Sequence, residues 1–255
     1  MKYYLSIASL VNNEGLWLKE WIEYHLSKGI EHFYLYDTGS TDDTKEVLKP
    51  YGELITYKEF KLPLPYQMTV LNELRKDSKS FWTAFVDPDE FLVCEGKLPD
   101  LLKEYEEFGG IGVNWAVYGS NGHDRRPIGG VLENYTRRGE LSNPVNTHIK
   151  TICQVDKIET IEHPHFFKYK EPYFCVTENK EPIDSPFSAY HSSDRIRINH
   201  YFCKSKEDYE QKIRRGRCDV PEDEYDWAKF NAHDLNEVEE RLYAKDNAQG
   251  EMENS

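Results

Sequence analysis

Three carboxylates stand within four positions at the end of an apolar stretch. Residues 82–86 are predicted to form a buried strand, which runs directly into Asp87-Pro88-Asp89-Glu90. Carboxylates crowded at a strand end repel one another and lose hydration, so a divalent cation or a polar ligand often accounts for such a cluster. Asp87 and Asp89 are therefore candidate metal ligands, although Asp, Pro and Asp are also good turn residues.

A second acidic strand end occurs earlier in the chain. Residues 32–36 are predicted to form a buried strand, followed by the polar turn Asp37-Thr38-Gly39-Ser40-Thr41-Asp42 and a short helical segment at 45–48. In an open α/β sheet, ligands bind beyond the carboxyl ends of the parallel strands. We therefore expect Asp37 and Asp87 to lie at one edge and to share a site.

The surrounding segments alternate between strand and helix patterns. Apolar side chains recur at helical spacing just before Gly29, which predicts an amphipathic helix at residues 16–28. This alternation predicts a mostly parallel sheet with helices on both faces. Beyond residue 120 the pattern loosens into short strands and polar loops. The further strands are expected at 54–60, 82–86 and 111–118, and the further helices at 66–77 and 98–107.

The composition limits the class of partner. A net charge of −14 over 255 residues argues against nucleic acid, whose binding relies on clustered basic side chains. A chain of this length suits one domain. Basic residues do gather locally, in a group that suits either a diphosphate or the solvated face of a helix: Lys204, Lys206, Lys212, Arg214, Arg215 and Arg217.

Cysteine usage and the amino-terminal segment bear on location. The 5 cysteines show no short paired spacing, so we expect free thiols in a reducing cytosol. The apolar residues 1–11 are interpreted as the first strand and not as a leader. No stretch reaches the roughly 18 apolar residues that span a bilayer. The prediction is a cytoplasmic protein without a transmembrane segment, for which any membrane contact is peripheral.

Eight short blocks of the sequence form a recognisable pattern. The first five blocks are Asn13-Glu14, Glu20-Trp21, Tyr24-His25, Asp37 to Asp42 and Asp87 to Phe91. They resemble the nucleotide-sugar half of GT-A glycosyltransferases of the family 2 type. The other three are Tyr118 to His123, His163-Pro164-His165 and Asn199 to Ser205, and they resemble glycosyltransferase family 92.

The resemblance covers about residues 3 to 217. Two positions depart from the pattern: Asn12, where a basic residue is common, and Asn121, where serine is common.

This resemblance implies a fold and its boundaries. The expected fold is α/β of the GT-A type, with a Rossmann-like, mostly parallel central sheet flanked by helices. One domain is expected at residues 1–233, with a nucleotide-sugar-binding half at 1–95 and a looser acceptor half at 96–233. Residues 234–255 are expected to form a polar tail.

The resemblance also implies a metal site. Asp89 is expected to bind the cation directly, while Asp87 contacts the donor ribose or reaches the metal through water. The cation would stabilise the charge that develops on a nucleoside diphosphate as it leaves. Carboxylates suit Mn²⁺ or Mg²⁺, and an imidazole from His200 favours Mn²⁺. A lone strand histidine is otherwise often a hydrogen-bonded core residue.

Nucleotide binding is assigned mainly to the ends of the first two strands. Asp37 would accept the imide hydrogen of uracil, unless it caps the following helix. Glu14 would help to hold the base or the ribose, and the turn that contains Ser40 would let the backbone approach the ligand closely. Asn13 is also expected to bind the nucleotide, and Lys204 would contact the diphosphate.

The sequence does not identify the general base that inverting transfer requires. The candidates are Asp124 and Glu133, in the region where family 2 enzymes often place their base, and each is equally a surface charge. His163 and His165 are interpreted as pocket-shaping residues. Trp115 and Tyr118 are interpreted as either sugar-stacking or core aromatics.

The predicted function is that of a metal-dependent hexosyltransferase. It would move a hexose, with galactose as the first candidate, from a UDP-sugar to a glycan hydroxyl with inversion. Lipid-linked glycans are among the acceptors considered. The alternatives are a catalytically silent glycan- or nucleotide-binding module and a nucleotidyltransferase of the same fold, although residues 8–15 lack the Gly-rich phosphate loop that the latter needs.

Overall fold

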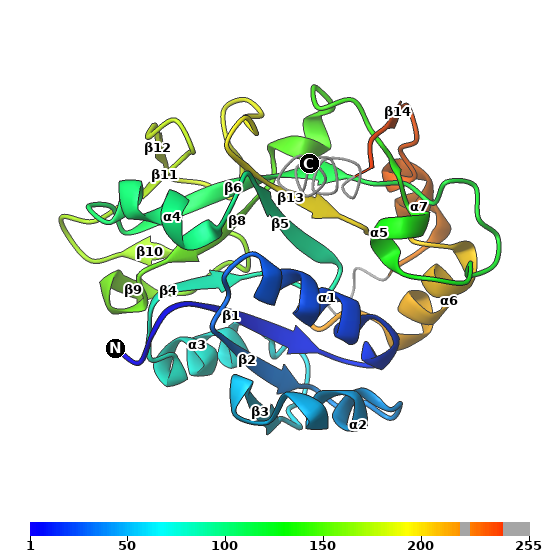
Figure 1. The fold of residues 1–255 in the computed structure, drawn as a ribbon, viewed down its shortest axis with the longest axis horizontal. Helices are drawn as coiled ribbons and strands as arrows, with labels where there is room; N and C mark the ends of the chain where they lie inside the picture. The colour runs from blue at the N-terminus through cyan, green and yellow to red at the C-terminus, as the bar shows by residue number, and fades with distance from the viewer. Residues whose placement is uncertain (220–224, 242–255) are drawn as a thin grey trace, which may run out of the picture.

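The central strands bury both of their faces, which requires a layer of helices on each side of the sheet. In β1 (Tyr3–Val11), Leu5 faces one core and Ala8 the other, and β2 (His32–Asp37) alternates in the same way. The computed structural model describes residues 1–219 and 225–241. In it, α1 (Gly15–Ser27) covers the first face and α3 (Gln67–Asp77) the second (Figure 1).

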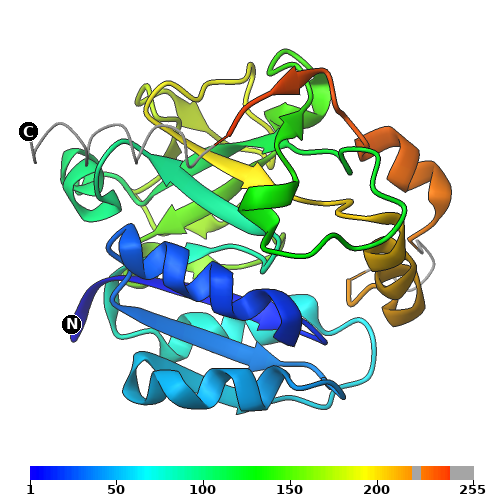
Figure 2. The ribbon, with the colours of Figure 1, turned by 45° about the vertical axis from the view of Figure 1, so that its right-hand side comes forward.

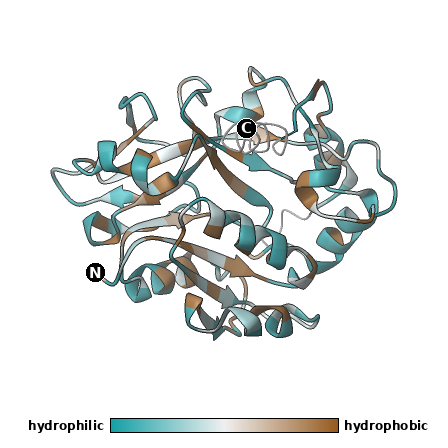
Figure 3. Ribbon diagram, viewed as in Figure 1, coloured by the Kyte–Doolittle hydropathy of each residue, from teal (hydrophilic) through white to brown (hydrophobic). Residues whose placement is uncertain are grey.

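Side-chain polarity follows these layers. Figure 3 shows hydrophobic segments on strands such as β5 (Glu90–Cys94) and β6 (Gly110–Val117), whereas the helices and loops around the sheet are hydrophilic or mixed. The predicted α/β class, with a mostly parallel central sheet flanked by helices, is confirmed.

The parallel part of the sheet brings the acidic strand ends to one edge. β3 (Ile55–Glu59), β2, β1 and β4 (Ser80–Phe85) follow one another in space and all run parallel. β8 (Ile149–Cys153) lies antiparallel between β4 and β6 (Gly110–Val117). Because β2 and β4 both pair in parallel with β1, the residues that follow them meet at the same edge, as predicted.

A second strand arrangement brings a histidine to this edge. β13 (Ile196–His200) pairs in parallel with β6 and antiparallel with β5 (Glu90–Cys94). The β13–β5 register places His200 opposite Glu90, directly after the acidic turn. Strand pairing thus brings together two residues, Glu90 and His200, that are more than one hundred positions apart in the chain.

The remaining elements are short, as predicted for the second half of the chain. The helix expected at 98–107 ends early, because the chain tightens into a 3₁₀ turn after Leu102. The other helices are α2 (Thr44–Leu48), α4 (Leu98–Leu102), α5 (Val131–Asn134), α6 (Lys206–Arg215) and α7 (Trp227–His233). The 3₁₀ turns are Lys49–Leu54, Lys103–Tyr105, Pro144–Thr147 and Val155–Lys157. The short strands are β7 (Arg137–Arg138), β9 (Ile158–Thr160), β10 (Lys168–Tyr169), β11 (Cys175–Val176), β12 (Pro182–Ile183) and β14 (Val238–Glu239).

Residues 234–241 differ from the expected tail. Strand β14 pairs with β7, and Glu240 accepts hydrogen bonds from Arg138 and Arg197. Asp234 accepts from the Ser120 N–H at 2.6 Å. These residues therefore pack onto the domain, and the rest of the expected tail, at 242–255, lies outside the described residues.

Two simpler expectations can also be compared with the structure. All five cysteines are free thiols, as predicted. Within residues 1–219 and 225–241, none of the helices has the length and apolar character needed to cross a bilayer.

A buried histidine fastens α1 to the second half of the sheet. His25 Nδ1 donates to the Trp21 carbonyl at 2.8 Å, and its Nε2 accepts from the Leu92 N–H of β5 at 3.1 Å. The ring is fully buried, and burial lowers its pKa to about 3, so it stays neutral. Both ring nitrogens are satisfied by backbone, which makes His25 a structural residue.

We predict that His25→Phe lowers the free energy of unfolding by about 1–3 kcal/mol, because the Leu92 N–H is left buried without an acceptor. Urea unfolding measures this change. The matched control is His163→Phe, at an exposed histidine, which should leave the unfolding free energy within error of the wild type. Equal losses in both variants would contradict the structural role of His25.

Candidate functional site

Helix α6 carries two cations to the acidic sheet edge. The Ser205 side chain accepts from the Asp208 N–H, and the Asp208 carboxylate accepts from the Ser205 N–H, so a capping box fixes the first turn. Figures 1 and 2 place α6 beyond the carboxyl ends of β1 and β2. With the first turn fixed, Lys212 and Arg215, three residues apart on one helix face, point toward this edge.

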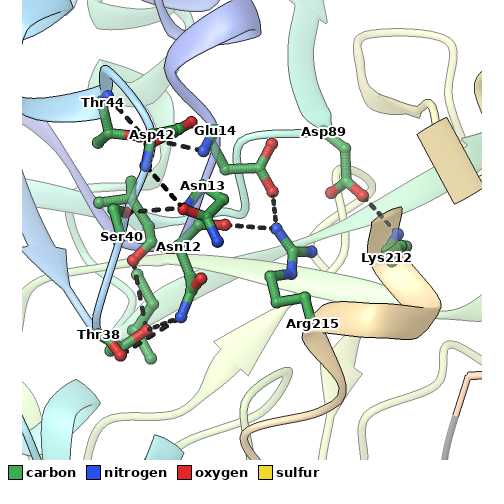
Figure 4. Close-up of polar contacts among 12 residues, drawn as sticks. Asn12, Asn13, Glu14, Thr38, Ser40, Asp42, Thr44, Asp89, Lys212 and Arg215 are labelled. Carbon is green, nitrogen blue, oxygen red and sulfur yellow. Dashed lines mark hydrogen bonds and ion pairs between the residues drawn. The ribbon is translucent and has the colours of Figure 1, made fainter. Parts of the chain in front are cut away.

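Two ion pairs join α6 to the amino-terminal half of the chain (Figure 4). Lys212 Nζ lies 2.9 Å from Asp89 Oδ2, and both side chains are only 12% exposed. Arg215 pairs with Glu14 and also donates to the Asn12 carbonyl at 2.7 Å. Because water screens partly buried pairs less than surface pairs, these contacts hold α6 against the loop after β1 and the turn after β4.

The acidic turn after β4 is braced by its own third carboxylate. The Asp87 N–H donates to Glu90 Oε2 at 2.8 Å, and the Glu90 N–H donates to the Asp87 carbonyl at 3.0 Å. Lys150 Nζ, from β8, lies 2.6 Å from Asp87 Oδ2 and 3.6 Å from Glu90 Oε2. Burial raises the pKa of Glu90 to about 8 against the opposing effect of Lys150. Asp87 and Lys150 therefore form the charged pair, while Glu90 is mostly protonated at neutral pH.

Asp89 stays ionised although it is buried. Burial on its own would raise its pKa, but Lys212 and His200 hold it well below its ordinary value. Burial lowers the pKa of His200, so this ring is neutral at pH 7. Lys212 is therefore the cation that keeps the Asp89 carboxylate ionised. His200 Nε2 faces Asp89 Oδ1 at 3.6 Å, and its buried Nδ1 has no hydrogen-bond partner in the described part of the chain.

Two adjoining cavities open at this edge. The first, of about 480 Å³, is lined by Asp87 and Asp89 together with side chains of β6, β8 and α6. The second, of about 530 Å³, shares Asp89 and adds Lys204, whose Nζ lies 5.4 Å from the centre of the Trp17 ring. The predicted metal ligands therefore come together, and Lys204 lies in the neighbouring cavity.

The predicted nucleotide-binding residues of the strand ends mostly brace two loops. Asn13 Oδ1 accepts from the loop after β2, and the Asn13 N–H donates to Ser40 Oγ at 2.8 Å (Figure 4). Asp37 is 3% exposed, and its Oδ1 accepts from the Gly39 and Ser40 N–H groups. Its Oδ2 accepts from the Tyr57 hydroxyl at 2.7 Å. Both oxygens of Asp37 are thus engaged in the fold, in a turn and not in a helix cap. Asp37 lines neither cavity, so it lies at the same edge as Asp87 but does not share a cavity with it.

The two candidate bases lie away from the acidic edge. The Asp124 side chain is 78% exposed and pairs with Lys206 at 2.8 Å. Glu133 is exposed on α5, and neither carboxylate lines either cavity. The structure does not bring them to Asp87 and Asp89, so we assign neither a catalytic role.

Sequence reasoning missed Lys150, although a signal was present. Lys150 is the only charged residue in the buried strand β8, and a buried ammonium needs an anionic partner. The partner could not be named, because the β4–β8 and β6–β8 pairings that bring Lys150 to Asp87 join distant segments. His148, directly before β8, was missed for the same reason and also lines the first cavity.

The sheet and its acidic edge correspond to the arrangement expected of a GT-A glycosyltransferase. The model of glycosyltransferase family 92 matches residues 2–217. The chain belongs to glycosyltransferase family 92.

Two plant proteins of this family are similar to the chain over most of its length. A family 92 protein of Oryza sativa subsp. japonica is 28% identical over 179 residues, which are 66% of this chain and 30% of that protein. A family 92 protein of Ricinus communis is 25% identical over 227 residues, 83% of this chain and 37% of that protein. The chain thus spans about a third of the length of these relatives.

Among solved structures, residues 1–349 of S. aureus TarS in complex with UDP-GlcNAc are 14% identical with a TM-score of 0.43, and the match covers 74% of this chain and 62% of that TarS fragment. Glucosyl-3-phosphoglycerate synthase from Mycobacterium tuberculosis is 18% identical with a TM-score of 0.35, covering 45% of this chain and 44% of that enzyme.

The buried Glu90 predicts a pH-dependent stability. Its pKa in the folded chain, about 8, exceeds the ordinary value of 4.5, so the folded chain binds more protons and its free energy of unfolding falls as pH rises between these values. Glu90→Gln removes this titration and should flatten the dependence between about pH 5 and 8. Urea unfolding at several pH values measures the slope. Glu133→Gln, at an exposed carboxylate, should keep the wild-type slope, and an unchanged slope in Glu90→Gln would refute the assignment.

Proposed function

We propose that the chain is a metal-dependent glycosyltransferase that moves a hexose from a UDP-sugar to a glycan hydroxyl with inversion. The observation that carries the proposal is the meeting of Asp87 and Asp89 with the cations of α6 at one cavity, beyond the carboxyl ends of parallel strands. Membership of glycosyltransferase family 92 supports the class of reaction. The choice of a UDP donor follows the sequence resemblance, with galactose as the first candidate sugar.

The cations of α6 suit a diphosphate. Lys212 and Arg215 both line the first cavity, and each is paired with one carboxylate. A diphosphate brings several anionic oxygens, so it can accept hydrogen bonds from both side chains at once. Arg217 lines the same cavity and pairs with Asp219. Under the proposal, these side chains bind and orient the donor phosphates.

The donor set at Asp89 and His200 fits a divalent cation. One carboxylate oxygen and one imidazole nitrogen face each other at 3.6 Å, close enough to bind one ion together. Within the described residues, no group of three or more ligating side chains gathers, so donor phosphates and water would supply the other ligands. When bound, Mn²⁺ or Mg²⁺ supplies Lewis-acid stabilisation of the departing diphosphate. Asp87 contributes to this metal site indirectly. Its ion pair with Lys150 fixes the turn that carries Asp89.

A nucleotide-binding module without catalysis is the second candidate. One observation favours it: Lys150 and Lys212 already neutralise Asp87 and Asp89. In such a module the acids would serve only to position the lysines. Release of UDP from a UDP-sugar separates the two candidates, because the module would bind the nucleotide and leave the sugar bond intact.

We predict that Asp89→Asn lowers the rate of UDP release from UDP-galactose by about 100-fold or more, because it removes an anionic ligand and keeps the shape of the side chain. A coupled UDP assay with Mn²⁺ measures the rate. Excess chelator should abolish the wild-type activity. A fully active Asp89→Asn variant, or a wild type indifferent to chelator, would remove the metal from the proposal.

Asp124→Asn is the matched control, because it makes the same chemical change at a carboxylate outside both cavities. Its activity should equal that of the wild type. A large loss in this variant would return Asp124 to consideration as the general base.

We predict that Arg215→Met weakens UDP binding, at a cost of about 1.5–3 kcal/mol for a lost charge-assisted contact. Isothermal calorimetry with UDP and Mn²⁺ measures the affinity. The control is Lys206→Met on the same helix, whose side chain is 52% exposed, pairs with Asp124 and lines neither cavity. Equal UDP affinity in the Arg215→Met variant and the wild type would show that α6 does not bind the diphosphate.

A further inference from the structure

Trp115 packs against three histidine rings at the wall of the first cavity: His148, His165 and the proposed metal ligand His200, whose ring centre lies 4.3 Å from that of the indole. The indole, on β6, stacks on His148 with ring centres 4.7 Å apart and planes 12° apart, and it meets His165 edge-on at 5.1 Å. Trp115, His148 and His165 line the cavity that also contains Asp87 and Lys150. With the two imidazole centres only 5.8 Å apart, they present one composite surface.

Backbone contacts fix which nitrogen of each ring carries the hydrogen. His148 Nδ1 lies 2.9 Å from the Val145 carbonyl, and His165 Nδ1 lies 2.8 Å from the Ile149 carbonyl. A carbonyl oxygen can only accept, so both Nδ1 atoms must donate. Burial is the main cause that lowers the pKa of both rings, which keeps them neutral at pH 7. Each Nε2 therefore has a free lone pair, and no described side chain or backbone group donates a hydrogen bond to it.

The chemistry of this surface selects its ligand. Two neutral acceptors need a partner that brings hydrogen-bond donors. A cationic donor is disfavoured, because the charge of Lys150 acts on His165. A third histidine or carboxylate that would complete a metal site with these rings is absent among the described residues. Neutral hydroxyl groups meet all three conditions.

We propose that Trp115, His148 and His165 form a subsite for the hydroxyl groups of an uncharged sugar ring. This inference rests on the proposed function and extends it by naming the residues that bind the hydroxyl groups of the sugar. The two imidazole Nε2 atoms accept hydrogen bonds from sugar hydroxyls, and Trp115 keeps the two rings in place. The sugar is either the hexose of the donor or a ring of the acceptor, since both carry hydroxyl donors.

The test compares His148→Phe and His165→Phe with the wild type. Each change keeps a planar ring and removes the acceptor, so binding of the sugar should weaken about fivefold to tenfold per lost hydrogen bond. UDP affinity, measured by calorimetry, should stay unchanged because UDP carries no hexose. His165→Gln, which restores an acceptor oxygen, should recover part of the loss.

Two readouts separate the sources of the sugar. If the donor hexose occupies the subsite, the variants lose the affinity that UDP-galactose has beyond UDP. If the acceptor occupies it, that difference is kept, and the variants lose the stimulation of UDP release by a panel of methyl glycosides. Sugars in which one hydroxyl is replaced by fluorine should bind as weakly as sugars in which it is replaced by hydrogen. Fluorine can accept a hydrogen bond but cannot donate one to an imidazole Nε2.

His163→Phe is the matched control. His163 is exposed, does not line either cavity, and its Nδ1 accepts from the His165 N–H, so it has the opposite tautomer. It should behave as the wild type. Unchanged sugar binding in both test variants, or an equal loss in His163→Phe, would overturn the subsite. A wild type that binds no UDP would instead overturn the proposed function, and methyl galactoside binding by saturation-transfer NMR, without nucleotide, would then still test the subsite.

Discussion

The pairing of α6 cations with carboxylates of the sheet edge is the interaction on which the site depends. Lys212 and Asp89 are both nearly buried, so neither charge would be tolerated there without the other. The pair joins a helix near the end of the described chain to a turn after the fourth strand. Arg215 and Glu14 add a second connection beside it. These two pairs therefore help to set the position of α6 relative to the acidic turn.

Strand pairing and capping determine where these charges can meet. β5 follows the acidic turn directly and pairs with β13, so the carboxylates and His200 are placed by one ladder. The capping box at Ser205 then starts α6 at Lys206, six residues after His200, and this short connection limits the positions that Lys212 can take. The same edge receives Lys150 through β8. Three separate parts of the second half thus converge on one turn of the first half.

The sequence pattern predicted the class of sheet, the positions of most elements and the placement of Asp37 and Asp87 at one edge of the sheet. These features could be predicted because hydrophobic periodicity and the order of strand, turn and helix are local properties of the sequence. The partners of these acids could not be predicted in the same way. Lys150 reaches Asp87 only through antiparallel pairing of β8, and His148 reaches Trp115 through the β6–β8 ladder. Asp37 was predicted to bind a ligand because of its residue type and its position at a strand end. In the structure its carboxylate instead accepts hydrogen bonds from Tyr57 and from two backbone N–H groups.

The ion pairs have a consequence for how donor and metal would bind under the proposed function. While Lys212 is paired with Asp89, the carboxylate offers a cation only part of its charge. A diphosphate that accepts hydrogen bonds from Lys212 and Arg215 would draw both away from Asp89 and Glu14, and the freed carboxylate would then hold a divalent ion more strongly. Because such coupling is reciprocal, the metal would equally favour binding of the diphosphate. The buried pairs would thus keep the acidic edge neutral in the free chain and make donor and metal bind together.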